Sequence, residues 1–264
     1  MLQQRPKKSL GQNFLVNRKI AEAEAAHAAG KTVLELGAGY GTLTSELCKK
    51  AKKVVAVEKD EGLFDTLKAE LSSKNLKLIK GDFFDVESEI EKEHVDIMIA
   101  NIPYNLSSRV IGWLEQHSLP AVLCLQKEFV EHMTAKPDTS KYSKLSVIAA
   151  LEFRIVKIMD VSKGNFNPVP KVDSAIVLIE PSGRKVSEEE NRLISMLMQH
   201  KKKKLRNAIY DSRKELGLSD EMARSIAEAT EHNADRVFKL EPSVLLKIAD
   251  WLMAEMGKTH IQNE

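Results

Sequence analysis

Sequence features that would indicate a secreted, membrane-bound or metal-binding protein are scarce in this chain. The only two cysteines, Cys48 and Cys124, have neither the spacing of metal ligands nor that of a redox pair. No apolar run reaches the length of a membrane-spanning helix. Residues 1–8 lack the apolar centre of a signal peptide, and no repeat or low-complexity segment occurs. We therefore expect a protein of the reducing cytoplasm that binds neither a membrane nor a metal.

An excess of charge of one sign is also lacking, because the net charge is only +2. Composition alone therefore does not indicate nucleic-acid binding. Basic residues nevertheless group within residues 5–8, 49–53 and 201–206, while acidic residues group elsewhere. A nearly neutral chain can thus present a basic face. For any single cluster, a solvated helix surface is the simpler explanation.

The hydrophobic pattern predicts strands that alternate with helices. Short apolar runs, several of them rich in β-branched residues, predict buried strands at residues 32–36, 54–57, 76–79, 95–100 and 121–125. Helical segments lie between them, so we predict a doubly wound, mostly parallel α/β sheet with helices on both faces.

Three further segments are less regular. Residues 1–17 show no periodicity and are expected to form an arm or lid, and residues 145–151 form either a helix or a strand. Residues 153–158 alternate in polarity and residues 175–179 are apolar. We expect these last two segments to close the sheet as an antiparallel hairpin at its edge.

A break in composition at residues 181–185 predicts a linker. Everything after it has a helical pattern, beginning with Ser187 and Glu190 in the spacing of a capping box. We therefore predict two domains. Residues 1–181 carry the sheet, and residues 186–264 form a small all-helical domain.

Two helix ends are expected in the helical domain. Helical phase would place Lys201 on the same stripe as Leu197 and Leu205. Since four successive lysines cannot all face solvent on a straight amphipathic helix, a helix should end or break within 201–204. The last helix is expected to begin at Pro242 and to continue until Gly257.

Glycines or polar residues follow four successive predicted strands, namely Gly37 with Gly39, then Glu58, Asp82 and Asn101. The carboxyl ends of parallel strands meet at one edge of a sheet, so these residues predict one elongated pocket. The glycines have the spacing G-x-G-x-G rather than G-x-G-x-x-G, which disfavours pyrophosphate binding. An acid after the second strand can accept from both ribose hydroxyls. A nucleoside ligand is therefore predicted.

The fourth strand leads into the sequence Asn101-Ile102-Pro103-Tyr104. The amide oxygen and the carbonyl before the proline accept hydrogen bonds, and the tyrosine ring offers a flat face for stacking. Together they could hold the exocyclic amine of a flat base. The alternative, an ordinary loop after a strand, does not account for an amide, a proline and an aromatic ring delivered together at this edge.

This pattern resembles that of S-adenosylmethionine-dependent methyltransferases, and residues 101–104 resemble the signature of those that methylate an amino nitrogen conjugated to a ring. Further blocks resemble the small-subunit ribosomal RNA adenine dimethyltransferases in family order. They lie at residues 8–15, 101–107, 126–128, 166–175 and 201–207. Ile at position 102 slightly favours the archaeal branch of this family. Residues 137–142 depart from the family pattern because they lack the glycine that this loop usually carries.

The resemblance implies that S-adenosylmethionine is the cofactor and that one group of residues holds it. Within this group, Asp82 would contact the adenine of the cofactor and Glu58 its ribose, and the glycines would meet its methionine part. The implied cofactor-binding residues are Gln12, Asn13, Leu15, Gly37, Gly39, Glu58, Asp82 and Asn101.

The resemblance also implies residues that handle the RNA. Asn101 and Pro103 would present the target amine, and Tyr104 and Phe166 would sandwich the target adenine between their rings. Phosphate contacts would come from a basic set in the helical domain. This set is Lys201, Lys202, Lys203, Lys204 and Arg206.

The function implied by the resemblance is dimethylation of two adjacent adenines near the 3′ end of small-subunit ribosomal RNA, late in subunit assembly. The partners would be that RNA and the assembling small subunit, bound by a monomer. A large-subunit ribosomal RNA adenine methyltransferase of the antibiotic-resistance type and a non-catalytic ribosome-assembly factor remain alternatives. A nicotinamide dehydrogenase is disfavoured by the glycine spacing.

Overall fold

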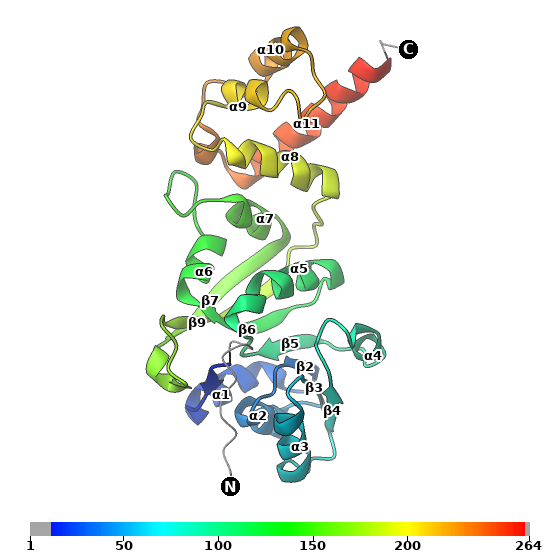
Figure 1. The fold of residues 1–264 in the computed structure, drawn as a ribbon, viewed down its shortest axis with the longest axis vertical. Coiled ribbons are helices and arrows are strands. Elements are labelled where there is room, and N and C mark those ends of the chain that lie inside the picture. The colour runs from blue at the N-terminus through cyan, green and yellow to red at the C-terminus, as the bar shows by residue number, and fades with distance from the viewer. Residues whose placement is uncertain (1–11, 262–264) are drawn as a thin grey trace. The chain divides into compact units, whose positions relative to one another are not determined.

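The computed structural model describes residues 12–261, and these form two compact units (Figure 1). Unit 1 contains the chain up to Val130 together with Arg154–Pro181, and unit 2 contains Glu131–Phe153 together with the chain from Ser182. The predicted boundary at 181–185 is therefore one of three crossings between the units. The prediction of one boundary between two continuous domains is wrong for residues 131–153, because these residues belong to the helical unit.

The sheet of unit 1 has seven strands in the order β4-β3-β2-β5-β6-β9-β7. The first five in this order pair in parallel, and β9 runs antiparallel to β6. The doubly wound, mostly parallel prediction is thus confirmed. The strands are β2 (Thr32–Leu36), β3 (Lys53–Glu58), β4 (Leu76–Lys80), β5 (Ile97–Ala100), β6 (Ala121–Gln126), β7 (Phe153–Val161) and β9 (Ser174–Pro181).

The strand order reverses between β2 and β5, which lie side by side in Figure 1. From β2 the chain proceeds outward through β3 to β4 and then returns to the other side of β2. Such a switch point is where open α/β sheets bind ligands, beyond the carboxyl ends of the strands. Gly37 follows β2 and Asn101 follows β5, so the two predicted site segments flank this point.

Both faces of the central strands are covered. Successive side chains of a strand point to opposite faces, yet Val33 and Leu34 of β2 are both fully buried, as are Val54 and Val55 of β3. The covering helices of unit 1 are amphipathic and short. They are α1 (Arg18–Ala25), α2 (Thr42–Lys50), α3 (Glu61–Glu70), α4 (Glu87–Glu91) and α5 (Ser107–His117). Helix α6 (Lys127–Met133) begins in unit 1 and ends in unit 2. Unit 1 also has the 3-10 turns η2 (Ala26–Ala28), η3 (Tyr104–Leu106) and η4 (Lys163–Asn165).

A second sheet was not predicted from the sequence. Its two short strands, β1 (Phe14–Leu15) and β8 (Phe166–Asn167), pair antiparallel, with Leu15 opposite Phe166. Two-residue strands are too short to show a periodicity. This sheet ties the end of the predicted arm to the segment that carries Phe166. The rest of the predicted arm, residues 1–11, lies outside the described residues.

Unit 2 is helical, as its sequence predicted. Its helices are α7 (Lys144–Glu152), α8 (Glu188–Gln199), α9 (Leu205–Asp211), α10 (Asp220–Ala229) and α11 (Pro242–Ile261), with the 3-10 turn η5 (Val237–Lys239). The capping box at Ser187 and Glu190 is present. The gap between α8 and α9 confirms the helix end predicted at the lysines. The last helix continues past Gly257, so its predicted end is wrong.

Residues 131–153 join unit 2 because α7 buries its apolar side chains among those of the C-terminal helices. Val147 of α7 and Leu193 of α8 are fully buried in the same core. Tyr142, just before α7, is also fully buried, and its hydroxyl donates to the carbonyl of Leu240 at 2.9 Å. The preceding loop adopts a positive φ of 63° at Asp138, a conformation that Asp tolerates better than most residues. Within residues 12–261, no helix combines the length and the apolar character needed to span a membrane.

Candidate functional site

A cavity of about 300 Å³ lies at the carboxyl ends of β2 to β5, within unit 1. Most of the predicted cofactor- and base-binding residues line it. These are Gln12, Asn13, Gly37, Glu58, Asp82, Asn101, Pro103, Tyr104 and Phe166. A smaller cavity of about 30 Å³ shares Asn13, Gly37 and Asn101 with it and is also lined by Leu15 and Gly39. The structure thus brings the predicted residues of unit 1 together.

The glycine loop after β2 approaches the end of the N-terminal arm closely. Gly39 has a φ of +58°, and a Cβ atom there would lie 2.7 Å from Cδ1 of Phe14. Gly37 also has a positive φ, but a Cβ there would meet nothing closer than Pro103 at 3.9 Å. Gly39 is therefore required by both conformation and space, whereas Gly37 is required by conformation alone.

Glu58 supports the glycine loop from the end of β3. Its side chain is buried, and its two carboxylate oxygens accept from the backbone N–H groups of Gly39 at 2.8 Å and Asp60 at 2.7 Å. Burial raises the pKa of Glu58, and these backbone donors oppose that rise. Each carboxylate oxygen can accept more than one hydrogen bond. The group is thus held rigidly at the cavity with acceptor capacity left for a ligand.

Asp82 lies at the other end of the cavity, after β4. Its carboxylate pairs with the ammonium of Lys59 at 2.8 Å and accepts from the backbone N–H of Phe84 at 3.1 Å. The Lys59 ammonium lowers the pKa of Asp82, so the group is a carboxylate at neutral pH. Phe83 is buried and lines the same part of the cavity.

Asn101 has one amide atom bonded and the other without a partner. Its Nδ2 donates to Oε2 of Glu24 at 3.0 Å. Its Oδ1 is buried and has no hydrogen-bond partner among the described residues. A buried acceptor without a donor is costly and therefore unusual in a native protein. Oδ1 of Asn101 is thus the free acceptor that the sequence predicted at this position.

The two predicted aromatic residues are both fixed at the cavity. The hydroxyl of Tyr104 lies 2.7 Å from Oγ of Ser174, which is fully buried on β9. Burial raises the pKa of Tyr104, so this hydroxyl is neutral. Phe166 is buried and is held in the two-stranded sheet opposite Leu15.

Sequence analysis missed three residues of this site. Glu24 sits on an amphipathic helix, where a glutamate usually indicates a solvent-facing position, and Ser174 was seen only as part of a motif block. Arg109 lines the cavity and places its guanidinium 3.7 Å from the ring centroid of Phe84. None of the three carries a local pattern. Glu24 and Ser174 bond to Asn101 and Tyr104 from elements distant in sequence, whereas Arg109 lies on the helix that follows Tyr104.

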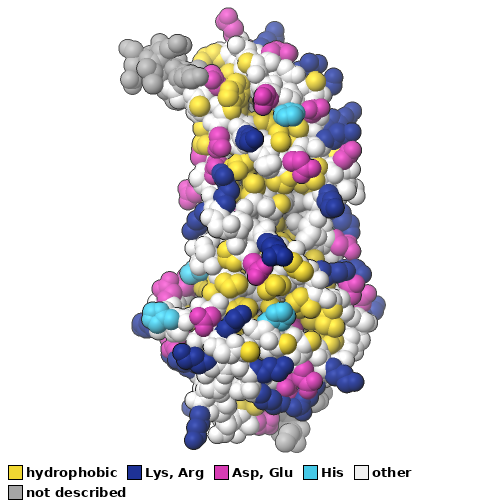
Figure 2. Space-filling model, turned by 180° about the vertical axis from the view of Figure 1, so that it is seen from behind, with side chains coloured by type: hydrophobic (Ala, Val, Ile, Leu, Met, Phe, Trp, Pro, Cys, Tyr) yellow, Lys and Arg dark blue, Asp and Glu magenta, His cyan; other side chains and the backbone are white. Residues whose placement is uncertain are grey.

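The predicted basic set lies in unit 2, and its members differ in their surroundings. The ammonium of Lys201 donates to the carbonyl of Tyr142 at 2.6 Å, and Lys203 pairs with Asp211 at 2.6 Å. Lys202 and Lys204 are exposed, and their ammonium groups bond to no side chain in the described part of the chain. On the face drawn in Figure 2, basic and acidic side chains are interspersed. Lys202 and Lys204 are therefore the members best placed for phosphate contacts.

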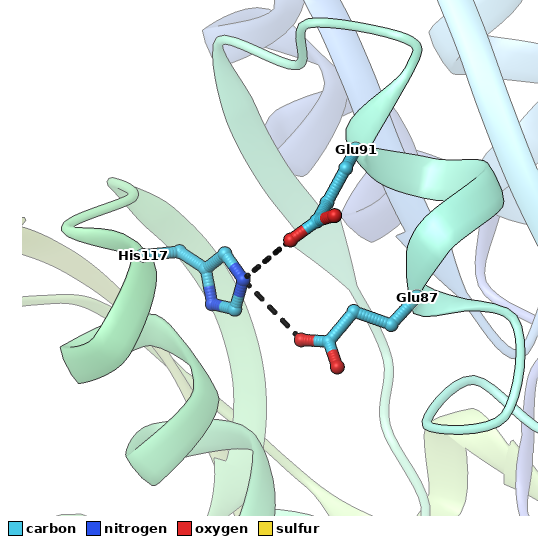
Figure 3. Close-up of side chains that lie close together, drawn as sticks. All are labelled: Glu87, Glu91 and His117. Atoms are coloured by element: carbon cyan, nitrogen blue, oxygen red, sulfur yellow. Dashed lines mark ion pairs between the residues drawn. The ribbon is translucent and has the colours of Figure 1, made fainter.

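A separate titratable cluster joins α4 to α5 (Figure 3). Nε2 of His117 lies 3.3 Å from Glu87 and 3.7 Å from Glu91, and Trp113 also donates to Glu87 at 2.5 Å. The imidazole and the two carboxylates lie close enough together to hold a metal ion between them. That the protein binds no metal stays a prediction.

Two buried glutamates near the glycine loop give a testable pH dependence. Burial raises the pKa of Glu35 to about 8, and that of Glu24 likewise to about 8, from 4.5. The native state therefore keeps protons that the unfolded chain releases between pH 4.5 and 8. The free energy of unfolding should fall as pH rises through this window, by roughly 4 to 5 kcal/mol for each group.

We expect Glu35→Gln, which cannot ionise, to flatten this fall and to be more stable than the wild type at pH 8. Urea unfolding at pH 5, 6.5 and 8 measures the effect. Glu70→Gln, at the exposed end of α3, serves as the matched control. A profile for Glu35→Gln that parallels the wild type would contradict the expectation.

The fold and the site define a class of protein. The protein is a Rossmann-like methyltransferase. It has a doubly wound sheet with a cavity at the switch point, a buried acid at the end of β3 and the segment Asn101–Tyr104 after β5. The profile described as ribosomal RNA adenine dimethylase matches residues 3–247. The chain belongs to that family. It is an S-adenosylmethionine-dependent ribosomal RNA adenine dimethyltransferase.

Relatives and solved structures agree with this assignment. The chain is 39% identical over 256 residues to a Thermococcus gammatolerans protein named probable ribosomal RNA small subunit methyltransferase A, covering 94% of this chain and 90% of the relative. A Methanopyrus kandleri protein of the same name is 35% identical, and the match covers 96% of this chain and 94% of the relative. A dimethyladenosine transferase from Plasmodium falciparum has a TM-score of 0.77 at 27% identity, covering 92% and 98%. The 23S rRNA methyltransferase ErmE, at 23% identity and a TM-score of 0.60, shares the fold and covers 90% and 100%.

Proposed function

We propose that this enzyme dimethylates the exocyclic amines of two adjacent adenines near the 3′ end of small-subunit ribosomal RNA. It acts in the cytoplasm as a monomer, late in assembly of the small subunit. The names of the archaeal relatives support the choice of subunit. The observation that supports the chemistry most directly is the partnerless Oδ1 of Asn101, beside Tyr104 and Phe166 in one cavity.

The residues around the cavity suit S-adenosylmethionine. The open space at Gly37 would admit the methionine part, the Glu58 carboxylate would accept from the ribose hydroxyls, and Asp82 would accept from the adenine amine. Gln12, Asn13 and Leu15 would cover the bound molecule from the arm. When bound, S-adenosylmethionine supplies a methyl group on a sulfonium, which is an electrophile.

Asn101 and the loop after it would prepare the adenine amine for reaction. The lone pair of this amine is delocalised into the base, which makes it a poor nucleophile. If Oδ1 of Asn101 and the carbonyl of Ile102 accept its two hydrogens, the lone pair is directed to the methyl group. Pro103 fixes the backbone of this loop, and the rings of Tyr104 and Phe166 would hold the base. As the nitrogen bonds to the methyl carbon, the carbon–sulfur bond would break and the sulfur would leave as a neutral thioether. The methylated nitrogen would be acidic, so its proton would leave without a strong base.

Unit 2 would supply phosphate contacts through its basic set. We expect the double variant Lys202→Gln/Lys204→Gln to weaken binding to small-subunit RNA and to lower the salt slope of binding by roughly 1 to 2, because each phosphate contact releases counterions. Lys201→Gln should instead reduce stability, because its ammonium bonds to the loop carbonyl of Tyr142. Binding titrations at several salt concentrations measure this. An unchanged slope for the double variant would show that these lysines are only a solvated surface.

The proposed substrate is tested by methyl transfer from labelled S-adenosylmethionine to small ribosomal subunits that lack the 3′-end dimethyladenines. Large subunits are the control, and the product is digested to nucleosides. Dimethyladenosine in small-subunit RNA alone is the expected result. Label in large-subunit RNA would favour the resistance-type activity instead. No label in either RNA, with cofactor still bound, would favour a non-catalytic assembly factor.

A further inference from the structure

We propose that Glu24 is a positioning residue that fixes which way round the amide of Asn101 faces the cavity. The inference rests on the proposed role of Asn101 as acceptor for the target amine. Glu24 lies on α1, is 1% exposed, and contacts Asn101 across 77 positions of sequence. Its Oε2 accepts from Nδ2 of Asn101 at 3.0 Å.

The chemistry of the pair determines the orientation. An ionised carboxylate has only acceptors, whereas an amide has a donor side and an acceptor side. While Glu24 is ionised, Nδ2 must therefore face it, and Oδ1 must point away from it. That leaves Oδ1 without a hydrogen-bond partner among the residues that the structure describes. A reversed amide would present two N–H donors to an amine that also donates, and the amine could not be held.

Apart from its hydrogen bond with Asn101, the side chain of Glu24 makes no hydrogen bond or ion pair among the described residues. Its second oxygen, Oε1, is buried and has no hydrogen-bond partner within residues 12–261. No basic side chain pairs with Glu24 in the described part of the chain. A buried carboxylate with neither a cation nor a full set of donors weakens the fold, and such groups are retained where they serve a site.

Protonation of Glu24 would remove the constraint. A carboxylic acid both donates and accepts, so it can hold the amide of Asn101 either way round. Burial raises the pKa of Glu24 to about 8, and the hydrogen bond from Asn101 opposes the rise. The ionisable groups that interact with it are Glu35 on β2 and Cys124 on β6, and the charges of Glu24 and Glu58 both raise the pKa of Glu35. All are acids, so none supplies a compensating positive charge.

The first test is the pH dependence of methyl transfer in single turnover, from pH 6 to 9.5, for the wild type and Glu24→Gln. The wild-type rate should rise severalfold around pH 8 and then level off, because the protonated acid still holds the amide the productive way part of the time. Glu24→Gln can accept or donate, so its rate should stay flat, close to that of the wild type at low pH and severalfold below it at pH 9.5. Its affinity for S-adenosylmethionine should change little, and its melting temperature should exceed that of the wild type above pH 8, because Gln cannot ionise. Glu22→Gln, on the exposed side of the same helix, is the matched control.

The second test does not need activity. The side-chain amide signal of Asn101, assigned in ¹⁵N spectra by its loss in Asn101→Asp, should titrate with a midpoint near 8 in the wild type. It should not titrate in Glu24→Gln. An Asn101 signal that is independent of pH, or a wild-type pH profile retained by Glu24→Gln, would overturn the proposal. Failure of the wild type to methylate any ribosomal RNA would overturn the proposed function while leaving this titration to decide the role of Glu24.

Discussion

Asn101→Ala should lower the rate of methyl transfer at least a thousandfold while weakening cofactor binding less than tenfold. Removing one preorganised hydrogen-bonding group from a reacting centre commonly costs 10²–10³ in rate. Here the loss should be larger, because the same acceptor both holds the amine and turns its lone pair. Most of the cofactor contacts proposed here come from other residues, such as Glu58 and Asp82.

The measurement is single-turnover transfer with saturating small-subunit RNA, together with calorimetric titration of S-adenosylmethionine. The variant also leaves Oε2 of Glu24 without its donor, so the melting temperature must be compared with that of the wild type. Asn101→Asp keeps the size of the side chain but places a carboxylate against Glu24, and it should also be slow. Near-normal turnover in Asn101→Ala would refute the proposed mechanism.

Most of the sheet could be predicted from the sequence because its strands are buried on both faces. Such strands are short apolar runs bounded by glycine or polar residues, as at Thr32–Leu36 and Ala121–Gln126. The placement of residues 131–153 could not be predicted. Helix α7 is apolar on all sides, so its sequence does not reveal whether it packs on the sheet or on the C-terminal helices. Only the tertiary contacts of Tyr142 and Val147 decide it.

Part of the candidate site could also be predicted from the sequence, because the predicted strands determine which residues meet. Residues that follow strands meet because parallel strands share a carboxyl edge, so Gly37, Glu58, Asp82 and Asn101 could be grouped from their positions alone. Glu24 and Ser174 could not, because they approach from a helix and from an antiparallel strand. They bond to Asn101 and Tyr104, which the sequence did identify. The sequence pattern thus identified the groups that we propose contact the ligand, but not Glu24 and Ser174, which bond to two of those groups.

Glu58→Ala should weaken binding of S-adenosylmethionine by roughly 10²–10⁴, because two hydrogen bonds to a charged acceptor would be lost at about 1.5–3 kcal/mol each. Part of the loss has a second origin. The carboxylate also accepts from the backbone of Gly39 and Asp60, so its removal loosens the glycine loop. Affinity for the cofactor alone cannot separate the two contributions.

A double-mutant cycle separates them by comparing S-adenosylhomocysteine with its analogue that lacks both ribose hydroxyls. If Glu58 binds the ribose, the wild type should prefer the natural ligand strongly and Glu58→Ala should lose most of that preference. If Glu58 only supports the loop, the variant should weaken both ligands equally. Glu61→Gln, exposed at the start of α3, controls for the change of charge. The coupling energy, rather than the loss of affinity, therefore decides whether Glu58 contacts the cofactor or only shapes its site.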